Sequence, residues 1–397
     1  MAGIPLAGVL VCLLAERLRL DKARDRVPIR IGVTGTRGKS SVVRLIAAAL
    51  REAGTKTLAK TTGSKPVLIL PDGAEREIER PGPASIIEQK RLVRLAAELG
   101  VEVLVAELMA VRPDLLAVES RAILRPRLLV VTNVRLDHIE DQGRTKAEIA
   151  RSLAASFAAG MTVLIPEEEM LPEFREEAAR AGAELAAVPR SVNRIRPAGE
   201  TGALEFEANR HLAAAVAARL GIEAGTALRG MNKARPDFGS LRLWDVRLPG
   251  AGDVLRLVSA FAANDPDSTR RVLDALTAAG VLEGRRRIGL LNLREDRGDR
   301  TLQWLAAIRD GLLTDFEDVV LAGPPARAAM RRFKKGTPPC ARPRLTALAE
   351  NDPVRIMAGL ASETDGGKAA VIGLGNMGGL GNALVEYWET IGDPHGD

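Results

Sequence analysis

Short apolar runs rich in β-branched residues alternate along the chain with longer segments whose apolar positions recur every three or four residues. The first pattern predicts buried strands, and the second predicts amphipathic helices. In the first half we expect strands at Ile29–Val33, Val67–Leu70, Val101–Ala106, Leu128–Thr132 and Thr162–Ile165. We expect helices at Ser41–Ala53, Glu88–Leu99 and Ala147–Ala158. This alternation predicts an α/β fold with a parallel sheet between two layers of helices.

A second α/β pattern begins after residues 235–239, a stretch with proline and glycine that suits a linker. Strands are expected at Val254–Ala260, Arg287–Leu291, Val319–Ala322 and Ala370–Gly373. Helices are expected at Ser268–Ala279, Leu302–Gly311, Pro325–Phe333 and Asn382–Ile391. We therefore predict an apolar segment with a basic junction (1–26), a central domain (27–235) and a smaller C-terminal α/β domain (236–397).

The N-terminal segment carries no charge from Ala2 to Ala15, and a mixed, mainly basic stretch follows it. A helix needs about 20 apolar residues to span a bilayer, so this run is short. A signal peptide would carry its positive charges before the apolar run rather than after it. Three interpretations stay open: a short or truncated membrane anchor, an apolar helix that docks on a membrane partner, or a buried N-terminal helix.

The overall composition excludes two classes of protein. With 46% hydrophobic and 27% charged residues, the chain is neither mainly disordered nor a polytopic membrane protein. Aromatic residues make up only 3%, which argues against an aromatic platform for nucleic acid or sugar. The net charge of +6 agrees with an anionic substrate or a membrane surface, although the composition rich in arginine and alanine is the favoured explanation.

A glycine-rich turn lies between the first predicted strand and the helix that follows it. The turn reads Gly35, Thr36, Arg37, Gly38, Lys39, Ser40, Ser41. Glycines let the backbone approach phosphates, the helix N-terminus favours anions, the lysine reaches outer phosphates, and the hydroxyl can bind Mg²⁺. The strict P-loop pattern requires a glycine where this chain has Val33, so the turn is a tighter variant. We interpret it as an ATP-binding loop of a parallel-sheet ATPase.

Polar residues follow two of the predicted strands. Glu107 ends the strand at Val101–Ala106, and Asn133, Asp137 and His138 follow the next strand. Ligands of open α/β sheets gather at the carboxyl ends of the strands, so these side chains are expected on one rim. Glu107 is the candidate for holding Mg²⁺, although capping a helix or pairing with an arginine would also account for it. His138 is as readily structural as functional, because Mg²⁺ prefers oxygen ligands.

The chain resembles the Mur ligase superfamily, and more closely the ligase subunit of poly-γ-glutamate synthase, the PgsB/CapB family. The strings that carry this resemblance occur in order along nearly the whole chain. They are TGTRGKSS, KTTG, GP with EQK, AELMAVRPD, VTNVRLDHIE, FAANDP, REDRGDRT and GLGNMG. Each string alone is weak, but their common order is a strong signal. The resemblance implies a P-loop-type ATPase domain followed by a smaller Rossmann-like domain.

The resemblance also implies roles for single residues. It implies that the loop from Gly35 to Ser41 binds the ATP phosphates, with Lys39 catalytic. Ser40 and Glu107 would bind Mg²⁺, and His138 would hold a second Mg²⁺ or the acyl phosphate. Asn209 matches an asparagine that contacts adenine, and Arg235 falls near a hinge arginine. Thr61 and Thr62 would lie near the transferred phosphoryl group.

The implied reaction is ATP-dependent formation of γ-glutamyl amide bonds through an acyl phosphate, with release of ADP and phosphate. Arg294, Arg297 and Arg300 are candidates for gripping the carboxylates of glutamate or of the growing chain, although a solvated surface loop would look the same. The implied partners are membrane subunits of a poly-γ-glutamate synthase complex, without nucleic acid. This places the chain at the cytoplasmic face of the membrane; a homo-oligomer stays open.

Two departures from Mur ligases concern the substrate. No lysine occurs between Lys146 and Lys233, so the carbamylated lysine that many Mur ligases use is not expected. The string from Phe261 to Asn264 replaces an Asp-x-x-His string, which argues against a peptidoglycan substrate. The alternatives are a Mur-type ligase for a folate or cell-wall precursor, and a nucleotide-binding assembly subunit of a membrane complex.

Overall fold

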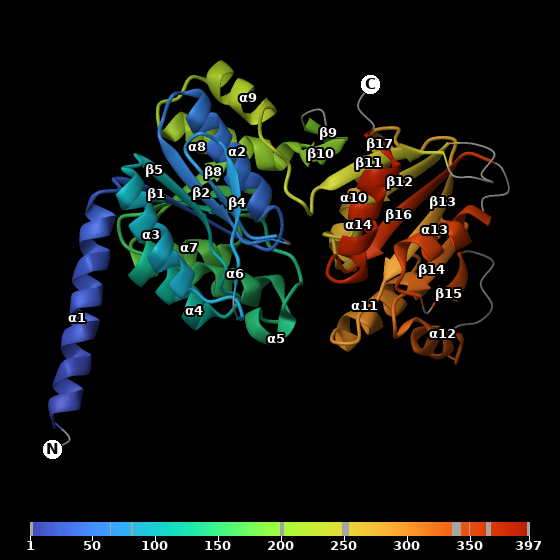
Figure 1. Cartoon of the computed structure of the whole chain (residues 1–397), viewed down its shortest axis with the longest axis horizontal. Coiled ribbons are helices and arrows are strands. Elements are labelled where there is room, and N and C mark those ends of the chain that lie inside the picture. The colour runs from blue at the N-terminus through green and yellow to red at the C-terminus, as the bar shows by residue number, and fades with distance from the viewer. Residues whose placement is uncertain are drawn as a thin grey trace. The chain divides into compact units, whose positions relative to one another are not determined.

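The computed structural model shows two units, each with its own sheet (Figure 1). It describes residues 3–63, 65–80, 82–198, 202–247, 254–335, 343–348, 350–362 and 367–394. The first unit comprises Met1–Ser191 and Ala208–Ala234, and the second comprises Val192–Glu207 and Arg235–Asp397. The sequence did not reveal that Val192–Glu207 lies with the second unit. The domain limits predicted above stay a prediction.

The sheet of the first unit has the strand order β4-β3-β2-β5-β1-β6-β7-β8. Its strands are β1 (Ile29–Thr34), β2 (Thr57–Thr61), β3 (Val67–Ile69), β4 (Glu75–Glu77), β5 (Val103–Glu107), β6 (Leu128–Val131), β7 (Thr162–Pro166) and β8 (Glu184–Val188). Pairing is parallel from β2 to β8, while β3 and β4 pair antiparallel. The five strands predicted for this half of the chain are confirmed, and β2, β4 and β8 were missed.

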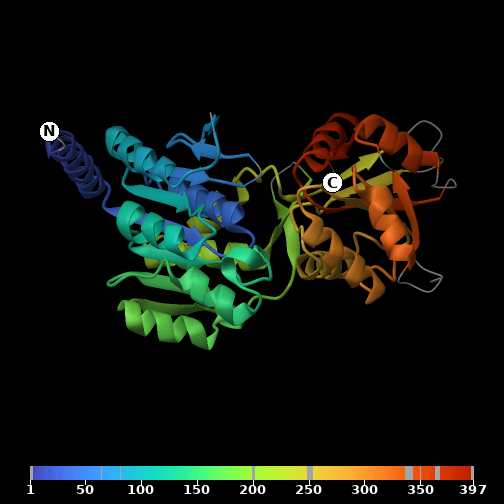
Figure 2. The same ribbon diagram turned by 90° about the horizontal axis from the view of Figure 1, so that it is seen from below.

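Helices cover both faces of this sheet (Figure 2). One layer holds α3 (Ile87–Leu99), α4 (Pro113–Ala117), the π-helix η1 (Val118–Leu124), α6 (Lys146–Ala154) and α7 (Pro172–Ala181). The other holds α2 (Lys39–Glu52), α8 (Glu207–Arg219) and α9 (Ala224–Asn232). The short α5 (Ile139–Gln142) and η2 (Glu167–Glu169) belong to connections. Each predicted helix of this half is present with slightly shifted ends.

The sheet of the second unit has the order β15-β14-β13-β16-β12-β11-β10-β9, with β17 paired to β11. The strands are β9 (Ile195–Ala198), β10 (Ala203–Phe206), β11 (Leu241–Val246), β12 (Leu255–Ser259), β13 (Arg286–Asn292), β14 (Asp318–Ala322), β15 (Arg344–Leu348), β16 (Ala369–Gly375) and β17 (Asp393–Pro394). The strands from β12 to β15 are parallel, and those from β9 to β11 are antiparallel. The mostly parallel α/β class predicted for both halves is confirmed.

Within the described residues of the second unit, five helices accompany the sheet, and the four predicted ones are among them. They are α10 (Pro266–Ala278), α11 (Gly298–Arg309), α12 (Ala326–Lys335), α13 (Pro353–Ser362) and α14 (Leu380–Ile391). Side chains of α10, α11 and α12 form one apolar layer, and side chains of α13 and α14 form the other. All three tryptophans of the chain, Trp244, Trp304 and Trp388, are buried in this unit.

A buried carboxylate connects three neighbouring strands of the second sheet. Asp318 at the start of β14 is 2% exposed and pairs with Arg286 of β13 and Arg344 of β15. Burial raises the pKa of Asp318, but the two guanidinium groups outweigh it and hold the pKa below its ordinary value. The charged form of this carboxylate is therefore part of the native structure.

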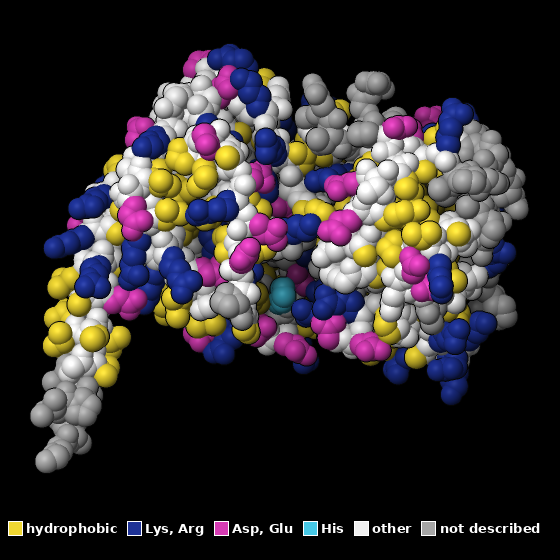
Figure 3. Space-filling view, viewed as in Figure 1, with side chains coloured by type: hydrophobic (Ala, Val, Ile, Leu, Met, Phe, Trp, Pro, Cys, Tyr) yellow, Lys and Arg dark blue, Asp and Glu magenta, His cyan; other side chains and the backbone are white. Residues whose placement is uncertain are grey.

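The N-terminal segment forms α1 (Gly3–Asp25), whose two ends differ in their surroundings. Near its C-terminal end, Leu20 and Ala23 are buried against the first unit. The apolar stretch from Val9 to Leu14 is exposed, with Val11 66% accessible (Figure 3). A buried helix was thus the wrong interpretation for this stretch, while residues 2–7 lie outside the described side chains. None of the helices within the described residues combines the length and the apolar character that crossing a membrane requires.

Candidate functional site

The phosphate loop, Gly35–Gly38, connects β1 to α2, as the sequence predicts. Both glycines have a positive φ, 121° at Gly35 and 76° at Gly38. A Cβ at Gly35 would lie 2.2 Å from Oγ1 of Thr132, and one at Gly38 would lie 2.7 Å from Oδ1 of Asn209. A side chain at either position would therefore clash as well as strain the backbone. Asn209 is brought against the loop by α8, which is far from it in sequence.

The segment after β6 holds the phosphate loop in place. The N–H groups of Thr36 and Arg37 donate to O and Oδ1 of Asn133, at 3.0 and 3.1 Å. In return, the carbonyl of Arg37 accepts from Nδ2 of Asn133 at 3.0 Å and from Oγ1 of Thr132 at 2.7 Å. The neighbouring strands β1 and β6 bring these two segments together, and the sequence pattern alone gave no sign of this bracing.

Lys39 is the first residue of α2, and its ammonium group lies in the hollow of the loop. Nζ donates to the carbonyl oxygens of Gly35 and Thr36, at 2.9 and 3.2 Å. Burial lowers the pKa of Lys39, while the nearby carboxylates, Glu107 foremost, oppose that shift. The helix N-terminus and this cation together make the loop a favourable place for phosphate.

Ser40 and Glu107 form the oxygen-rich part of the site. Oγ of Ser40 donates to Oε2 of Glu107 at 2.7 Å, and the backbone N–H of Thr62 donates to the same oxygen at 2.7 Å. Glu107 ends β5, which pairs with β1, and it is only 3% exposed. A hydroxyl and a carboxylate at this spacing are suitable ligands for a hard divalent cation.

The described residues hold no group of three or more histidine, cysteine or acidic side chains that could bind a metal alone.

A buried network supports the strand end that carries Glu107. Gln89 of α3 donates through Nε2 to the carbonyl of Glu107 at 3.0 Å and to Oε1 of Glu119 at 2.6 Å. Glu119 also accepts from the N–H groups of Met109 and Ala110, both at 2.9 Å. Burial raises the pKa of Glu119 above its ordinary value, and these hydrogen bonds oppose the shift. Gln89 lies in the EQK string of the family resemblance, but neither it nor Glu119 was assigned a role from the sequence.

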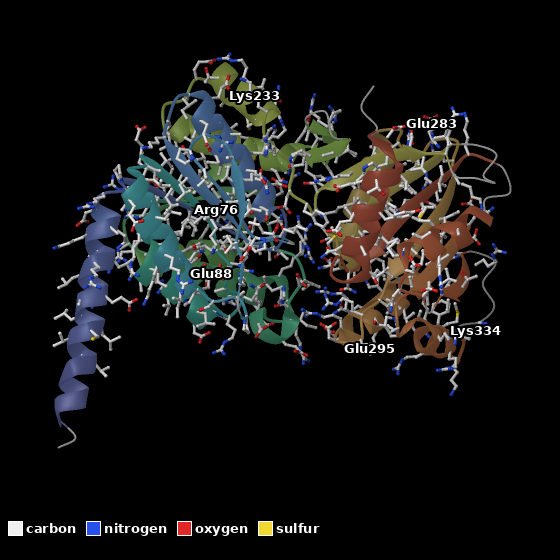
Figure 4. All side chains as sticks on the ribbon, in the orientation of Figure 1. Arg76, Glu88, Lys233, Glu283, Glu295 and Lys334 are labelled. Carbon is white, nitrogen blue, oxygen red and sulfur yellow. The ribbon has the colours of Figure 1, made fainter. Side chains whose placement is uncertain are left out.

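Lys60 and Glu88 form a second buried contact beside this network. Lys60 of β2 is 1% exposed, and its Nζ lies 3.1 Å from Oε2 of Glu88. Figure 4 shows Glu88 on α3, where Arg80 also binds it through Nε at 2.7 Å. The next residue, Thr61, is fully buried, and within the described part of the chain its Oγ1 has no hydrogen-bond partner. Such an orphaned hydroxyl is unusual in a protein interior and fits a ligand at this strand end.

His138 lies on the rim expected for it, in a strained conformation. Its φ of 48° is in the left-handed region, which non-glycine residues adopt rarely and often at functional sites. Its Nε2 is 3.5 Å from Oδ2 of Asp137, which also binds Arg37 at 3.1 Å. Asp137 thus connects the phosphate loop to His138.

The three candidate substrate arginines belong to the second unit and differ in what they contact. Arg294 makes a two-pronged pair with Asp296, with distances of 2.9 and 2.7 Å. Arg300 is buried and donates to Oδ1 of Asn376 at 3.1 Å. Arg297 precedes α11 and is half-buried. All three lie near the carboxyl ends of β13 and β16.

The remaining candidates lie at less informative positions. Ser41 is half-buried in the first turn of α2. Arg235 is exposed and is the residue at which the chain enters the second unit for the last time. The binding and catalytic roles of all the candidates stay predictions.

Comparisons with known proteins agree with this architecture. Residues 33–197 match the Mur ligase middle domain, and residues 247–391 match the poly-gamma-glutamate synthase CapB C-terminal domain. The chain is 30% identical to PGA synthase CapB of Bacillus subtilis (strain 168) over 385 residues, 96% of each chain. It is 34% identical to Capsule biosynthesis protein CapB of Bacillus anthracis over 323 residues, 80% of this chain and 68% of that one.

Solved structures with low sequence identity share the fold. E. coli FolC in complex with DHPP and ADP has a TM-score of 0.64 at 16% identity, over 95% of this chain and 91% of that one. MurF from Acinetobacter baumannii has a TM-score of 0.63 at 15% identity, over 94% and 79%. A folylpolyglutamate synthase/dihydrofolate synthase from Yersinia pestis, complexed with AMPPNP and a Mn ion, has a TM-score of 0.60 at 16% identity, over 94% and 92%.

The fold and the matched middle domain define an ATP-dependent amide ligase of the Mur ligase type. Within that class, the identity to two CapB proteins over most of the chain is decisive. The chain belongs to the poly-γ-glutamate synthase CapB family.

Proposed function

We propose that this chain joins glutamate units through γ-amide bonds, at the expense of ATP, by way of an acyl phosphate. The observation that carries the proposal is the site at the carboxyl ends of β1, β5 and β6. There Lys39 lies in a glycine-rich loop, and Ser40 and Glu107 face each other at 2.7 Å. The relatives named PGA synthase CapB and Capsule biosynthesis protein CapB supply the substrate class.

A carboxylate is a poor electrophile, so its oxygen first attacks the γ-phosphate of ATP and ADP leaves. The amine of the second reactant then attacks the acyl carbon, phosphate leaves, and the amine loses a proton. Catalysis of phosphoryl transfer is mostly positioning and charge stabilisation. Lys39 would leave the carbonyls of Gly35 and Thr36 to contact the outer phosphates. Mg²⁺, when bound, would neutralise phosphate charge, held by Ser40 and Glu107.

Other residues would complete the site. Thr61 and Thr62 would contact the transferred phosphoryl group, and the buried hydroxyl of Thr61 supports this. Asn209 would contact adenine, and Arg235 would act where the chain passes between the units. His138, held by Asp137, would stabilise the acyl phosphate or a second metal ion. Arg294, Arg297 and Arg300 would bind or position the substrate carboxylates, Arg300 through Asn376.

We also propose that the chain works at the cytoplasmic face of the membrane with subunits of a poly-γ-glutamate synthase complex. The exposed apolar stretch of α1, from Val9 to Leu14, supports contact with a membrane or a membrane partner. If this is so, replacing Val9, Val11 and Leu13 by serine should release the chain from the membrane fraction of cells. Retention equal to that of the unchanged chain would contradict a role of α1.

The ligase proposal is tested by identifying the product that the purified chain forms from ATP. If the purified chain shows no activity, the assay is repeated in detergent-solubilised membranes. We expect release of ADP and phosphate that glutamate stimulates. Lys39→Ala should abolish this release, whereas the exposed Lys56→Ala should retain it. Formation of AMP instead of ADP would contradict the acyl phosphate.

The same assay distinguishes the alternative substrates. Stimulation by a folate or a cell-wall precursor but not by glutamate would replace the proposed substrate. A third outcome combines two results: the unchanged chain forms no amide bond in membranes, and the Lys39→Ala variant fails to assemble into the complex. This outcome would indicate a nucleotide-binding assembly subunit.

A further inference from the structure

The exposed side of α12 carries a dense group of cations in the second unit. We name this group the basic face; its members are Arg327, Arg331, Arg332, Lys334 and Lys335. All five side chains are exposed, and α12 contains no acidic residue. Figure 3 shows basic side chains gathered over this helix, and in Figure 4 Lys334 lies at its outer edge.

The basic face is not explained by internal ion pairs. Within the described part of the chain, none of its five members has a carboxylate within 4.0 Å, whereas many other arginines of the chain do. Arg327 and Arg331 are four positions apart, as are Arg331 and Lys335, and like charges at that spacing destabilise a helix. Only the cations of the last turn gain from the helix dipole. The like-charge pairs therefore oppose the gain of the last turn, and the stability of the helix does not account for the number of cations on it.

The opposite side of α12 packs against the apolar core of the second unit. Ala329, Met330 and Phe333 are buried in the apolar layer of the second unit. Apart from the cations, the exposed positions of the helix hold only Ala328. A helix that inserts into a membrane surface presents large apolar side chains beside its cations, and this one presents none. The basic face thus suits a dissolved polyanion better than a lipid surface.

We propose that the basic face binds the γ-glutamyl polymer itself, which carries one free carboxylate per unit. This inference rests on the proposed function, because that function supplies the polyanion. Residues four apart on a helix are separated by about 6 Å along its axis. A γ-glutamyl unit contributes five main-chain bonds, or about 6 Å when extended. In a fully extended chain successive carboxylates point to opposite sides, so the carboxylates on one side recur about every 12 Å. Arg327 and Lys335, eight residues apart, are separated by about the same distance along the helix axis, and Arg331 lies between them.

Binding at this face would hold the growing chain between additions without taking part in the chemistry. The polymer would be retained by several weak, exposed contacts, each of which is readily exchanged. Such a surface allows the polymer to slide, because every unit of the polymer offers the same carboxylate. We therefore expect the basic face to affect affinity for long products and their final length, not the rate of a single bond.

The test uses a fluorescent γ-linked glutamate decamer and the full chain, with binding followed by anisotropy. The variant is Arg327→Gln/Arg331→Gln/Lys335→Gln. The matched control, Arg270→Gln/Arg271→Gln/Lys368→Gln, removes three exposed cations elsewhere in the same unit. We expect the α12 variant to bind about tenfold more weakly at 0.15 M salt and to lose most of the salt dependence. The control should change by less than about twofold, because charges beyond a Debye length are screened.

Equal affinities of the two variants would overturn the proposal. The proposal would also be overturned if the α12 variant lost binding to phosphatidylglycerol vesicles but bound the decamer as well as the unchanged chain does. That result would assign the basic face to lipid. Tryptophan fluorescence during urea unfolding reports the second unit, so it shows that the variant is folded. Glutamate-stimulated ADP release is measured in parallel. Its absence from the unchanged chain, both purified and in detergent-solubilised membranes, would refute the proposed function, whereas decamer binding tests the basic face independently.

Discussion

Replacing Glu119 by alanine is expected to loosen the segment that carries Glu107. The carboxylate of Glu119 is fully buried and accepts three hydrogen bonds, from Gln89 and from the N–H groups of Met109 and Ala110. The alanine variant leaves all three donors without this acceptor. The Gln89 amide would then retain only its bond to the carbonyl of Glu107.

The magnitude follows from those three donors. A buried donor left unsatisfied costs about 1–3 kcal/mol, and removing a desolvated carboxylate returns part of that cost. Met109 and Ala110 are only half-buried, so water can replace part of the lost bonding. We therefore take the lower limit, about 1 kcal/mol per donor, and expect local destabilisation of about 3 kcal/mol.

Hydrogen–deuterium exchange with mass spectrometry measures this locally. A loss of about 3 kcal/mol corresponds to about 100-fold faster exchange in peptides that cover β5 and the following turn. Peptides of β13, in the other unit, serve as internal reference. The control variant is Glu98→Ala, an exposed position of α3. Exchange within about threefold of the unchanged chain would refute the reasoning, because the network would then carry no stability.

Two further predictions concern the loop and the second unit. Gly35→Ala should weaken binding of an ATP analogue by at least about tenfold, measured by calorimetry, since the loop must move to relieve the clash. The control is Gly54→Ala. Gly54 also has a positive φ, but a Cβ added there meets no atom within 4 Å, so this variant should bind the nucleotide as the unchanged chain does. The lowered pKa of Asp318 stabilises the second unit above the ordinary aspartate pKa, and that stability is lost as pH falls through the lowered pKa. Asp318→Asn should therefore flatten the acid side of the pH profile of unfolding, followed by tryptophan fluorescence; an unchanged slope would contradict this.

Much of the fold could be predicted because the central parallel strands of both sheets are largely apolar runs. The missed strands lack that signal. β2 contains Lys60 yet is buried along its whole length, and Glu88 of α3 provides the compensating charge. β8, Glu184–Val188, is rich in alanine and reads equally well as helix. Tertiary contacts decide both cases, and a single sequence does not show them.

The position of a site residue could be predicted from the sequence where that residue directly follows a predicted strand. The phosphate loop, Glu107 and His138 follow strands directly, so their common rim could be expected. Gln89 and Glu119 could not, because they lie on helices whose contacts with β5 depend on packing. The two-pronged pair of Arg294 with Asp296 likewise depends on side-chain geometry rather than on spacing.

The ammonium group of Lys39 has a further consequence for turnover. Its Nζ donates to the carbonyl oxygens of Gly35 and Thr36, so the charge of Lys39 has hydrogen-bond partners within the loop itself. If Lys39 contacts the outer phosphates as proposed, departure of ADP exchanges one set of hydrogen-bond partners for another, which lowers the free-energy cost of releasing the nucleotide. A polymer-forming enzyme must discard a spent nucleotide after each bond. A lysine that returns to its own loop would let nucleotide exchange keep pace with elongation.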